Sequence, residues 1–291
     1  MKVLVTLVFL VGLITHSFAQ TESLNIVVVG SHPDDPDVVA GGTAIKFALL
    51  GHNVLFVSLT NGDAGHFSKG GGELARIRRA EAEEAGKRYG VTYQVLDNHD
   101  GELMPDLHVR LQIIRLIRNW NADVVIGPRA NDYHPDHRNT AILVQDAAYM
   151  VIVPNVAPDT PPLKKNPVFL YVQDNFQKPN PFSPDIAIDI SDVIDRKMFG
   201  VSAHHSQFFE WLPWLDGELE SIPKSDKDRM NWLKERWTFP ITNDVRKSLE
   251  RWYGADKART ITEAEAFEIC EYGRYPDESE IRRLFPMIEK K

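Results

Sequence analysis

The chain has 291 residues, 43% of them hydrophobic and 25% charged, which is enough to bury the core of one large domain or two small ones. Its formal charge is −8 and it has no cluster of lysine and arginine, so a nucleic-acid-binding protein is not expected. Cys270 is the single cysteine, which excludes an intrachain disulfide and a cysteine-based zinc site and leaves His, Asp and Glu as metal ligands.

The first 19 residues have the pattern of a signal peptide. Lys2 precedes the apolar run VLVTLVFLVGLI, and Ser17 and Ala19 occupy the −3 and −1 positions of a small-residue cleavage site. The alternative is an N-terminal membrane anchor, but the run is short for a span, which needs about 20 residues. We therefore expect cleavage after Ala19, export to the periplasm or the exterior, and no transmembrane segment in the mature chain.

From residue 24 to about 207, short β-branched runs alternate with helix-like segments. The strand-like runs are 24–30, 53–59, 91–96, 122–127 and 167–173. The helix-like segments are 37–50, 73–89, 106–120, 137–150 and 191–206. This alternation predicts βαβ units, and therefore an α/β fold with a Rossmann-like, mostly parallel sheet flanked by helices. In such sheets, ligands bind at the carboxyl ends of the strands.

The remaining segment, 208–291, holds five of the six tryptophans and many charges. Its helix-like stretches lie near 225–237, 243–252, 262–271 and 278–290. We therefore predict three parts: a signal peptide at 1–19, a core domain at 20–207 and a helical C-terminal extension at 208–291 packed on or near that core. The tryptophans of the extension have two interpretations, stacking on sugar rings or packing in a core.

Two motifs rich in histidine and aspartate follow predicted strands. The first is His32-Pro33-Asp34-Asp35, after 24–30, and the second is Asp132-Tyr133-His134-Pro135-Asp136-His137, after 122–127. Carboxylates this close together repel one another unless a cation lies among them. Two histidines and a carboxylate suit Zn²⁺ with one open position, and they suit Fe²⁺ or Mn²⁺ as well. Alone, the first motif could be a helix cap, and His134 and His137 of the second could be surface residues at a helix start. The two motifs together favour a metal site.

The two motifs together resemble those of the LmbE-like, or PIG-L, family of zinc-dependent de-N-acetylases. This family includes the N-acetylglucosaminyl-phosphatidylinositol deacetylases and the deacetylase of mycothiol synthesis. Other segments that fit the family are TNGDAG at 60–65, Arg78 with Glu81, Asp100 to Leu103, and Ala203 to Gln207. The resemblance covers about 25–207 and leaves the C-terminal extension outside it. It implies one zinc ion per chain.

Carried over residue by residue, the resemblance implies a zinc site with acid–base groups beside it. The implied zinc ligands are His32, Asp35 and His137. Asp34 matches the general base, His134 the residue that stabilises the oxyanion or protonates the leaving amine, and Asp136 the orienting partner of His134. Arg78 matches a substrate-contacting arginine. Where the family usually has glutamate after the two aspartates, this chain has Pro36.

Two residues of the glycine-rich stretch after 53–59 are further candidates for substrate contact. Asp63 lies in TNGDAG, and His66 follows that segment. Each also has a simpler interpretation, Asp63 as a turn residue and His66 as a solvated loop histidine.

The sequence therefore predicts an exported, zinc-dependent amidohydrolase that removes an N-acetyl group from an amino sugar or glycoconjugate. Two alternatives remain open: an amidase that acts on a larger amide conjugate, and a non-catalytic sugar-binding protein of the same fold. A nucleotide-binding Rossmann protein is disfavoured because no G-x-G-x-x-G follows the first strand. A serine hydrolase is disfavoured because the chain has no G-x-S-x-G.

Overall fold

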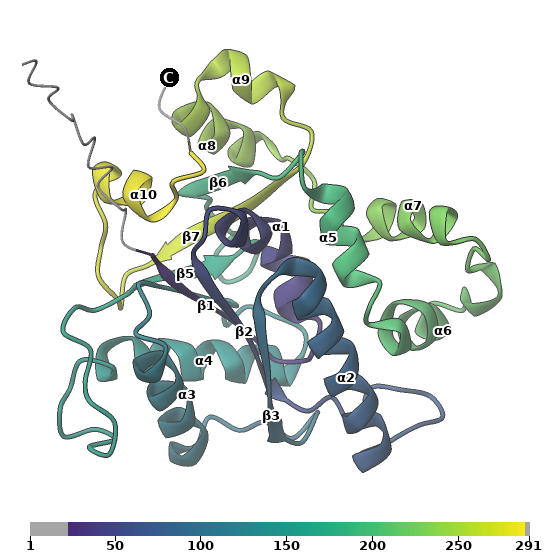
Figure 1. Cartoon of the computed structure of the whole chain (residues 1–291), viewed down its shortest axis with the longest axis horizontal. Coiled ribbons are helices and arrows are strands. Elements are labelled where there is room, and N and C mark those ends of the chain that lie inside the picture. Colours follow the sequence, from purple (N-terminus) through teal and green to yellow (C-terminus); the bar gives the residue numbers. More distant parts are fainter. Residues whose placement is uncertain (1–22, 289–291) are drawn as a thin grey trace, which may run out of the picture.

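The centre of the molecule is a seven-stranded sheet in the order β3-β2-β1-β4-β5-β7-β6 (Figure 1). The structure is a computed structural model that describes residues 23–288. Its strands are β1 (Asn25–Gly30), β2 (Asn53–Thr60), β3 (Thr92–Asn98), β4 (Val124–Gly127), β5 (Val168–Val172), β6 (Ile186–Asp189) and β7 (Ala264–Cys270). Strands β1 to β5 pair in parallel, and β7 runs antiparallel between β5 and β6. The predicted α/β class with a mostly parallel sheet is confirmed.

Helices cover both faces of the sheet (Figure 1). On one face lie α1 (Asp35–Leu49), α2 (Gly71–Tyr89) and α5 (Ile194–Val201), and on the other lie α3 (Leu107–Asn119) and α4 (Pro135–Met150). The side chains of β1 alternate between these faces: Ile26 and Val28 belong to one core, and Val27 and Val29 to the other. Burial on both sides explains why the strand reads as a continuous apolar run.

The segment after residue 207 contains most of the shorter helices. They are the π-helix η1 (Gln207–Trp211), α6 (Leu212–Leu215), the 3-10 helix η2 (Leu219–Ser221), α7 (Asp226–Trp237), α8 (Asn243–Tyr253), α9 (Ala255–Thr260) and α10 (Glu278–Leu284). The helices predicted near 225–237 and 243–252 are confirmed, and the one predicted for 278–290 ends at Leu284. Strand β6 and helix α9 were not predicted, because both are too short to show a period.

The helix predicted near 262–271 is wrong, because these residues form strand β7. Alanine and glutamate favour a helix intrinsically, but packing between two other strands outweighs that preference. Glu265 stabilises the strand in place: its carboxylate accepts two N–H groups of α1 and pairs with the equally buried Lys197 at 2.8 Å. The C-terminal segment therefore completes the central sheet, which a purely helical extension would not do.

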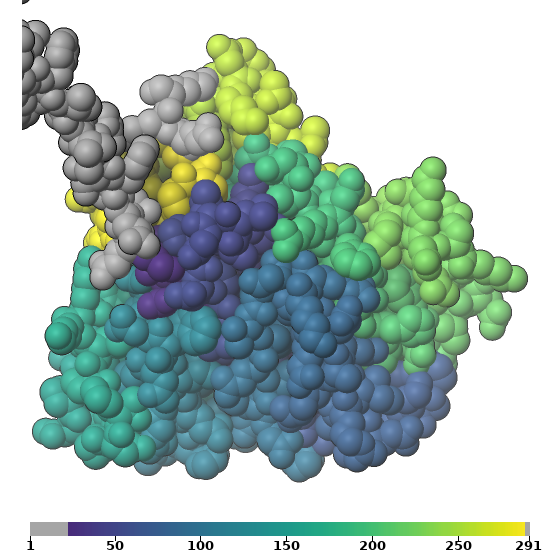
Figure 2. Space-filling model, viewed as in Figure 1, coloured from purple at the N-terminus to yellow at the C-terminus, as the bar shows by residue number. Residues whose placement is uncertain are grey.

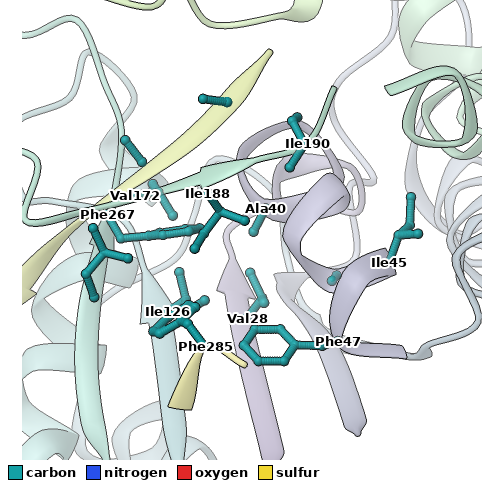
Figure 3. Packing of buried hydrophobic residues seen from close by; sticks show 14 of the residues in the cluster. Val28, Ala40, Ile45, Phe47, Ile126, Val172, Ile188, Ile190, Phe267 and Phe285 are labelled. Carbon is teal, nitrogen blue, oxygen red and sulfur yellow. The ribbon is translucent and has the colours of Figure 1, made fainter. Parts of the chain in front are cut away.

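Apolar residues from distant parts of the chain meet in the larger core (Figure 3). Phe285, just after α10, lies 5.5 Å from Phe47 of α1 and 6.3 Å from Phe267 of β7, measured between ring centroids. Gly42 lets α1 approach the sheet edge, since a Cβ there would lie 2.8 Å from Ile190 Cγ2. The C-terminal residues thus hold α1 against the sheet, and α1 starts at the first histidine–aspartate motif.

The predicted signal peptide, 1–19, lies outside the described residues. Between residues 23 and 288, the structure contains no helix that combines the length and the apolar character needed to cross a membrane.

Candidate active site

The two histidine–aspartate motifs meet at the carboxyl ends of β1 and β4, which are paired neighbours. Because β1 lies between β2 and β4, the strand order reverses at this point, and such reversals form ligand crevices in α/β folds. Gly30 permits the tight turn after β1, since a Cβ there would lie 2.6 Å from the Asp35 Cβ. The turn folds Asp35 back over the strand end, where its Oδ2 accepts the N–H groups of Ser31 and His32 at 2.8 Å.

Three atoms able to bind a metal converge beside these strand ends. His32 Nδ1 lies 3.2 Å from His137 Nε2, and Asp35 Oδ2 lies 3.4 Å from each of these nitrogens. A tetrahedral zinc site with bonds of about 2.1 Å separates its ligand atoms by about 3.4 Å. The spacing of these three residues, which we call the ligand set, therefore fits one divalent cation.

The charges around the ligand set also favour a cation. Burial raises the pKa of Asp35, but the charge of His137 and hydrogen bonding to His32 outweigh burial and hold that pKa well below its usual value. Burial lowers the pKa of His32, yet hydrogen bonds to Asp100, Asp136 and Asp35 outweigh it and raise that pKa well above its usual value. The site thus stabilises positive charge among its acids, and a metal ion competes with protons for the same atoms.

Two carboxylates hold the far side of the His32 ring. His32 Nε2 lies 3.1 Å from Asp100 Oδ1 and 3.3 Å from Asp136 Oδ2. A proton on Nε2 satisfies these carboxylates and leaves Nδ1 free as a metal ligand. The carboxylate of Asp136 is itself fixed, because it accepts two backbone N–H groups of the 101–103 loop. Asp136 therefore orients His32 through its side chain, and not His134 as the family resemblance implied.

Asp132 orients His137 in the same way. Its Oδ2 lies 3.1 Å from His137 Nδ1, while its Oδ1 accepts the N–H of His134 at 2.8 Å. The proton of the neutral His137 ring is therefore on Nδ1, which leaves Nε2 free to face the other members of the ligand set.

Asp132→Asn should weaken metal binding by about 10- to 100-fold, the usual effect of removing the partner of a ligating histidine. The amide would keep its oxygen towards the His134 N–H and present its NH₂ group to His137 Nδ1. The His137 ring would then carry its proton on Nε2, the ligand atom. Titration of dialysed protein with Zn²⁺ measures the effect, and Asp97→Asn, at a carboxylate that is 86% exposed, is the control. Equal affinities in the two variants would contradict this role of Asp132.

Asp34 lies next to the ligand set in an ion pair with Arg78. The Arg78 Nη2 donates to Asp34 Oδ1 at 2.6 Å, and the arginine side chain is buried. Burial raises the pKa of Asp34, the charge of Arg78 lowers it, and the net shift is upward. A carboxylate with a raised pKa and one oxygen outside the ion pair is suited to accept a proton. Arg78 lines the cavity, as a substrate contact would, but it donates its hydrogen bond to Asp34.

His134 is the N-cap of α4 and also lines the cavity. Its Nδ1 accepts the N–H of Asp136 at 3.2 Å, so the neutral ring carries its proton on Nε2. Burial lowers the pKa of His134, and the nearby rings of His32 and His137 lower it further. Ring nitrogens of the three histidines lie within 4.8 Å of one another. His134 nevertheless differs from the other two, because a neutral ring in this tautomer is a hydrogen-bond donor.

Two predicted substrate contacts lie outside the cavity lining. Asp63 Oδ2 contacts His99 Nδ1 at 2.6 Å, and Asp63 Oδ1 accepts the N–H of Asp100 at 3.0 Å. The carboxylate of Asp63 therefore holds the loop that carries Asp100. His66 Nε2 contacts Glu210 Oε2 at 2.8 Å, which ties its loop to the C-terminal segment. Neither side chain is among those that line the cavity.

The ligand set opens into a cavity of about 600 Å³. Part of its wall comes from the loop after β2, and part from the C-terminal segment around α6 and α7, which projects beside that loop (Figure 2). Glu210 joins the two parts, since its Oε2 accepts from Lys69 Nζ at 2.6 Å. Of the tail tryptophans, Trp211 and Trp237 line the cavity, whereas Trp252 is buried in the core.

Several members of the site were not predicted in these roles. They are the orienting residues Asp100 and Asp132 and the wall residue Gln173. Both aspartates belong to segments that match the family, close to predicted strand ends, so the sequence did contain an indication of their roles. Gln173 closes the strand-like run 167–173, and its place at a carboxyl strand end was the only indication.

Comparisons with known proteins identify relatives of this chain. A family model described as PIG-L, GlcNAc-PI de-N-acetylase, matches residues 27–148, which contain both motifs. The chain is 32% identical over 207 residues to a diacetylchitobiose deacetylase of Thermococcus kodakarensis, an alignment that covers 65% of this chain and 74% of that protein. It is 26% identical over 231 residues to a probable N-acetyl-alpha-D-glucosaminyl L-malate deacetylase 2 of Bacillus cereus, covering 74% of this chain and 97% of that protein.

Solved structures share the fold over most of the chain. N,N'-diacetylchitobiose deacetylase of Pyrococcus horikoshii has a TM-score of 0.64 at 23% identity, over 86% of this chain and 85% of that chain. The 4-carboxy-2-hydroxymuconate hydratase of Pseudomonas putida has a TM-score of 0.67 at 19% identity, over 88% of this chain and 99% of that chain. At such low identities the likeness shows the fold alone, and this fold serves more than one reaction.

Proposed function

The chain belongs to the PIG-L family, and on this premise we propose that it is an exported, zinc-dependent de-N-acetylase of an N-acetylated amino sugar or glycoconjugate. The observation that carries the proposal is the ligand set, whose His32 Nδ1, Asp35 Oδ2 and His137 Nε2 lie 3.2 to 3.4 Å apart beside Asp34. The names of the curated relatives, which are deacetylases of N-acetylated saccharides, support the substrate class.

The ligand set would hold one cation per chain. A zinc ion held there supplies Lewis acidity, which lowers the pKa of water to about 7 and polarises an amide carbonyl. The chain contributes the orientation of the ligands: Asp100 and Asp136 hold His32, and Asp132 holds His137. These contacts keep the proton of each histidine on the nitrogen that faces away from the cation.

Asp34 is the proposed general base. Its Oδ1 is held by Arg78, so its other oxygen is the one that takes the proton from the attacking water. Burial raises the pKa of Asp34 and brings it closer to the working pH, which improves proton transfer. The proton that Asp34 has accepted then passes to the leaving amine, because the amide nitrogen needs a proton before it departs.

His134 is the proposed oxyanion donor. Its Nδ1 accepts the Asp136 N–H at the N-terminus of α4, so the ring proton is on Nε2. The fold, and not the substrate, sets the position of this donor. A donor fixed before the reaction stabilises the charge that develops on the carbonyl oxygen without the cost of reorganisation.

A screen of N-acetylated amino sugars and short oligosaccharides for release of free amine tests this function. We expect release that stops when a chelator removes the metal and returns when zinc is added. The sugar-binding alternative predicts binding without release, and the amidase alternative predicts release only from larger amide conjugates. Metal-loaded protein that releases no amine from any N-acetylated saccharide would contradict the proposal.

Export is proposed from the pattern of residues 1–19 alone. Cleavage after Ala19 should give a mature chain that begins at Gln20, because Ser17 and Ala19 present small side chains to the peptidase. Intact-mass measurement of the chain recovered from outside the cytoplasm checks this. A mass that retains Met1 would instead favour the membrane-anchor alternative.

A further inference from the structure

The cavity is much larger than an acetyl group, since it measures about 600 Å³. Beyond the ligand set, part of its wall is formed where β5 ends, next to β4, and part by residues at and just after the end of α7. The cavity therefore has room along this wall for a part of the substrate other than the acetyl group.

Gln173 directly follows β5 and belongs to this wall. The residue is 5% exposed, and its Oε1 is buried without a hydrogen-bond partner in the part of the chain that the structure describes. The next residue, Asp174, is held by Nε and Nη2 of Arg129 at 2.7 and 3.0 Å, so the strand end is fixed. A buried carbonyl oxygen without a donor costs free energy, and a donor on a bound ligand would remove that cost.

Trp237, the last residue of α7, lines the cavity from the C-terminal segment. Its indole Nε1 is buried and has no acceptor within residues 23–288. The ring packs edge-on against Phe208, with centroids 5.0 Å apart, which fixes its direction. The two walls touch, because Gln173 Nε2 lies 3.5 Å from the carbonyl oxygen of Pro240, three residues after Trp237.

We propose that Gln173 and Trp237 form a subsite for a second sugar ring, beyond the ring that carries the acetylated amine. A hydroxyl group is both a donor and an acceptor, so a saccharide ring can satisfy the Gln173 carbonyl and the Trp237 N–H together. Trp211 and Phe239 line the same cavity and offer apolar surface to the C–H groups of a ring. This inference rests on the proposed function and narrows its substrate class to acetylated oligosaccharides.

A long acyl chain is the competing occupant of this wall. It can neither donate to Gln173 Oε1 nor accept from Trp237 Nε1. Its binding would leave both polar atoms buried and unpaired, which is unfavourable. The polar atoms therefore favour a hydroxyl-rich ligand.

Gln173→Leu and Trp237→Phe test the subsite. The first removes the carboxamide, with both Oε1 and the Nε2 that contacts the Pro240 carbonyl, and the second removes the indole N–H, while each leaves an apolar side chain. Their kcat/KM on N,N'-diacetylchitobiose is compared with that on N-acetylglucosamine. We expect the ratio of the two values to fall about 10-fold in each variant, the order of effect of one lost partner in a buried hydrogen bond.

Gln112 and Trp120 provide matched controls. Each also has a buried polar atom without a partner among the described residues, and both line a smaller hollow of about 360 Å³ at α3, apart from the ligand set. Gln112→Leu and Trp120→Phe should leave the substrate ratio unchanged. A fall in the controls as large as in the Gln173 and Trp237 variants would overturn the subsite.

The remaining outcomes distinguish failure of the subsite proposal from failure of the proposed function. An equal loss on both saccharides, or no loss on either, overturns the subsite while the function stands. If wild-type protein releases amine from neither saccharide, calorimetric titration with N,N'-diacetylchitobiose decides the subsite. The proposed function itself fails only when no other N-acetylated saccharide releases amine either. Weaker binding by the Gln173 and Trp237 variants than by their controls supports it, whereas equal binding, or none by wild type, overturns it.

Discussion

Asp34→Asn should lower kcat by about 10²- to 10⁴-fold, the usual contribution of a positioned acid–base group. Asparagine keeps the size of the side chain and an oxygen that can accept from Arg78 Nη2, as Asp34 Oδ1 does at 2.6 Å. The fold and the cavity wall should therefore stay unchanged, but the amide cannot take a proton from water. KM should change far less than kcat, because the lost interaction belongs to the transition state.

Asp35→Asn is the variant with which Asp34→Asn should be compared. Asp35 Oδ2 belongs to the ligand set, so its replacement should weaken metal affinity first and activity as a consequence, and added zinc should restore part of the activity. Turnover measured beside metal content separates the two aspartates. If metal-loaded Asp34→Asn turned over at nearly the wild-type rate, Asp34 would not be the general base.

His137→Ala should lose most of the bound metal and, with it, the activity. Wild-type protein should carry about one divalent ion per chain, bound by the ligand set. A tetrahedral site with one open position needs all three of these protein ligands. Removing His137 leaves only His32 Nδ1 and Asp35 Oδ2, which lie 3.4 Å apart, to hold the cation. Elemental analysis after dialysis measures the change.

His108→Ala is the matched control for that measurement. His108 is exposed on α3 and lies outside the cavity lining, so its removal should leave metal content unchanged. A His137→Ala protein that retained as much metal as the His108→Ala protein would show that the ligand set is assigned wrongly.

The parallel half of the fold is predictable because its strands are buried on both faces. The run of β1, from Ile26 to Val29, contributes side chains to two cores and therefore cannot be polar on either side. Strand β7 could not be predicted in this way. Glu265 reads as a solvated helix residue in sequence, and only the buried Lys197 and the N–H groups of α1, both distant in the chain, make its burial favourable.

The residues of the candidate site also differ in how well the sequence predicts them. His32, Asp35 and His137 come from two local motifs at neighbouring strand ends, so sheet topology alone brings them together. The partner of a side chain is harder to predict, because it depends on loop paths. Asp136 reaches His32 instead of His134, since the 101–103 loop donates two N–H groups to its carboxylate.

In the C-terminal segment, the sequence gives the least indication of whether a side chain lines the cavity or lies in the core. Trp237 lines the cavity and Trp252 lies in the core, although each stands near the C-terminal end of a helix in the same segment. Their difference follows from how α7 and α8 pack on the core, which is a property of contacts between distant residues.

The most direct test of a metal-dependent de-N-acetylase is the stoichiometry of its products. Protein depleted of metal, and the same protein reconstituted with one equivalent of zinc, would each be incubated with a saccharide chosen from the screen of N-acetylated amino sugars and oligosaccharides, and free amine and acetate would be measured in parallel. We predict equal amounts of amine and acetate from the reconstituted protein and neither from the depleted protein. Release that is the same with and without metal, or a reconstituted protein that releases neither product, would contradict this function.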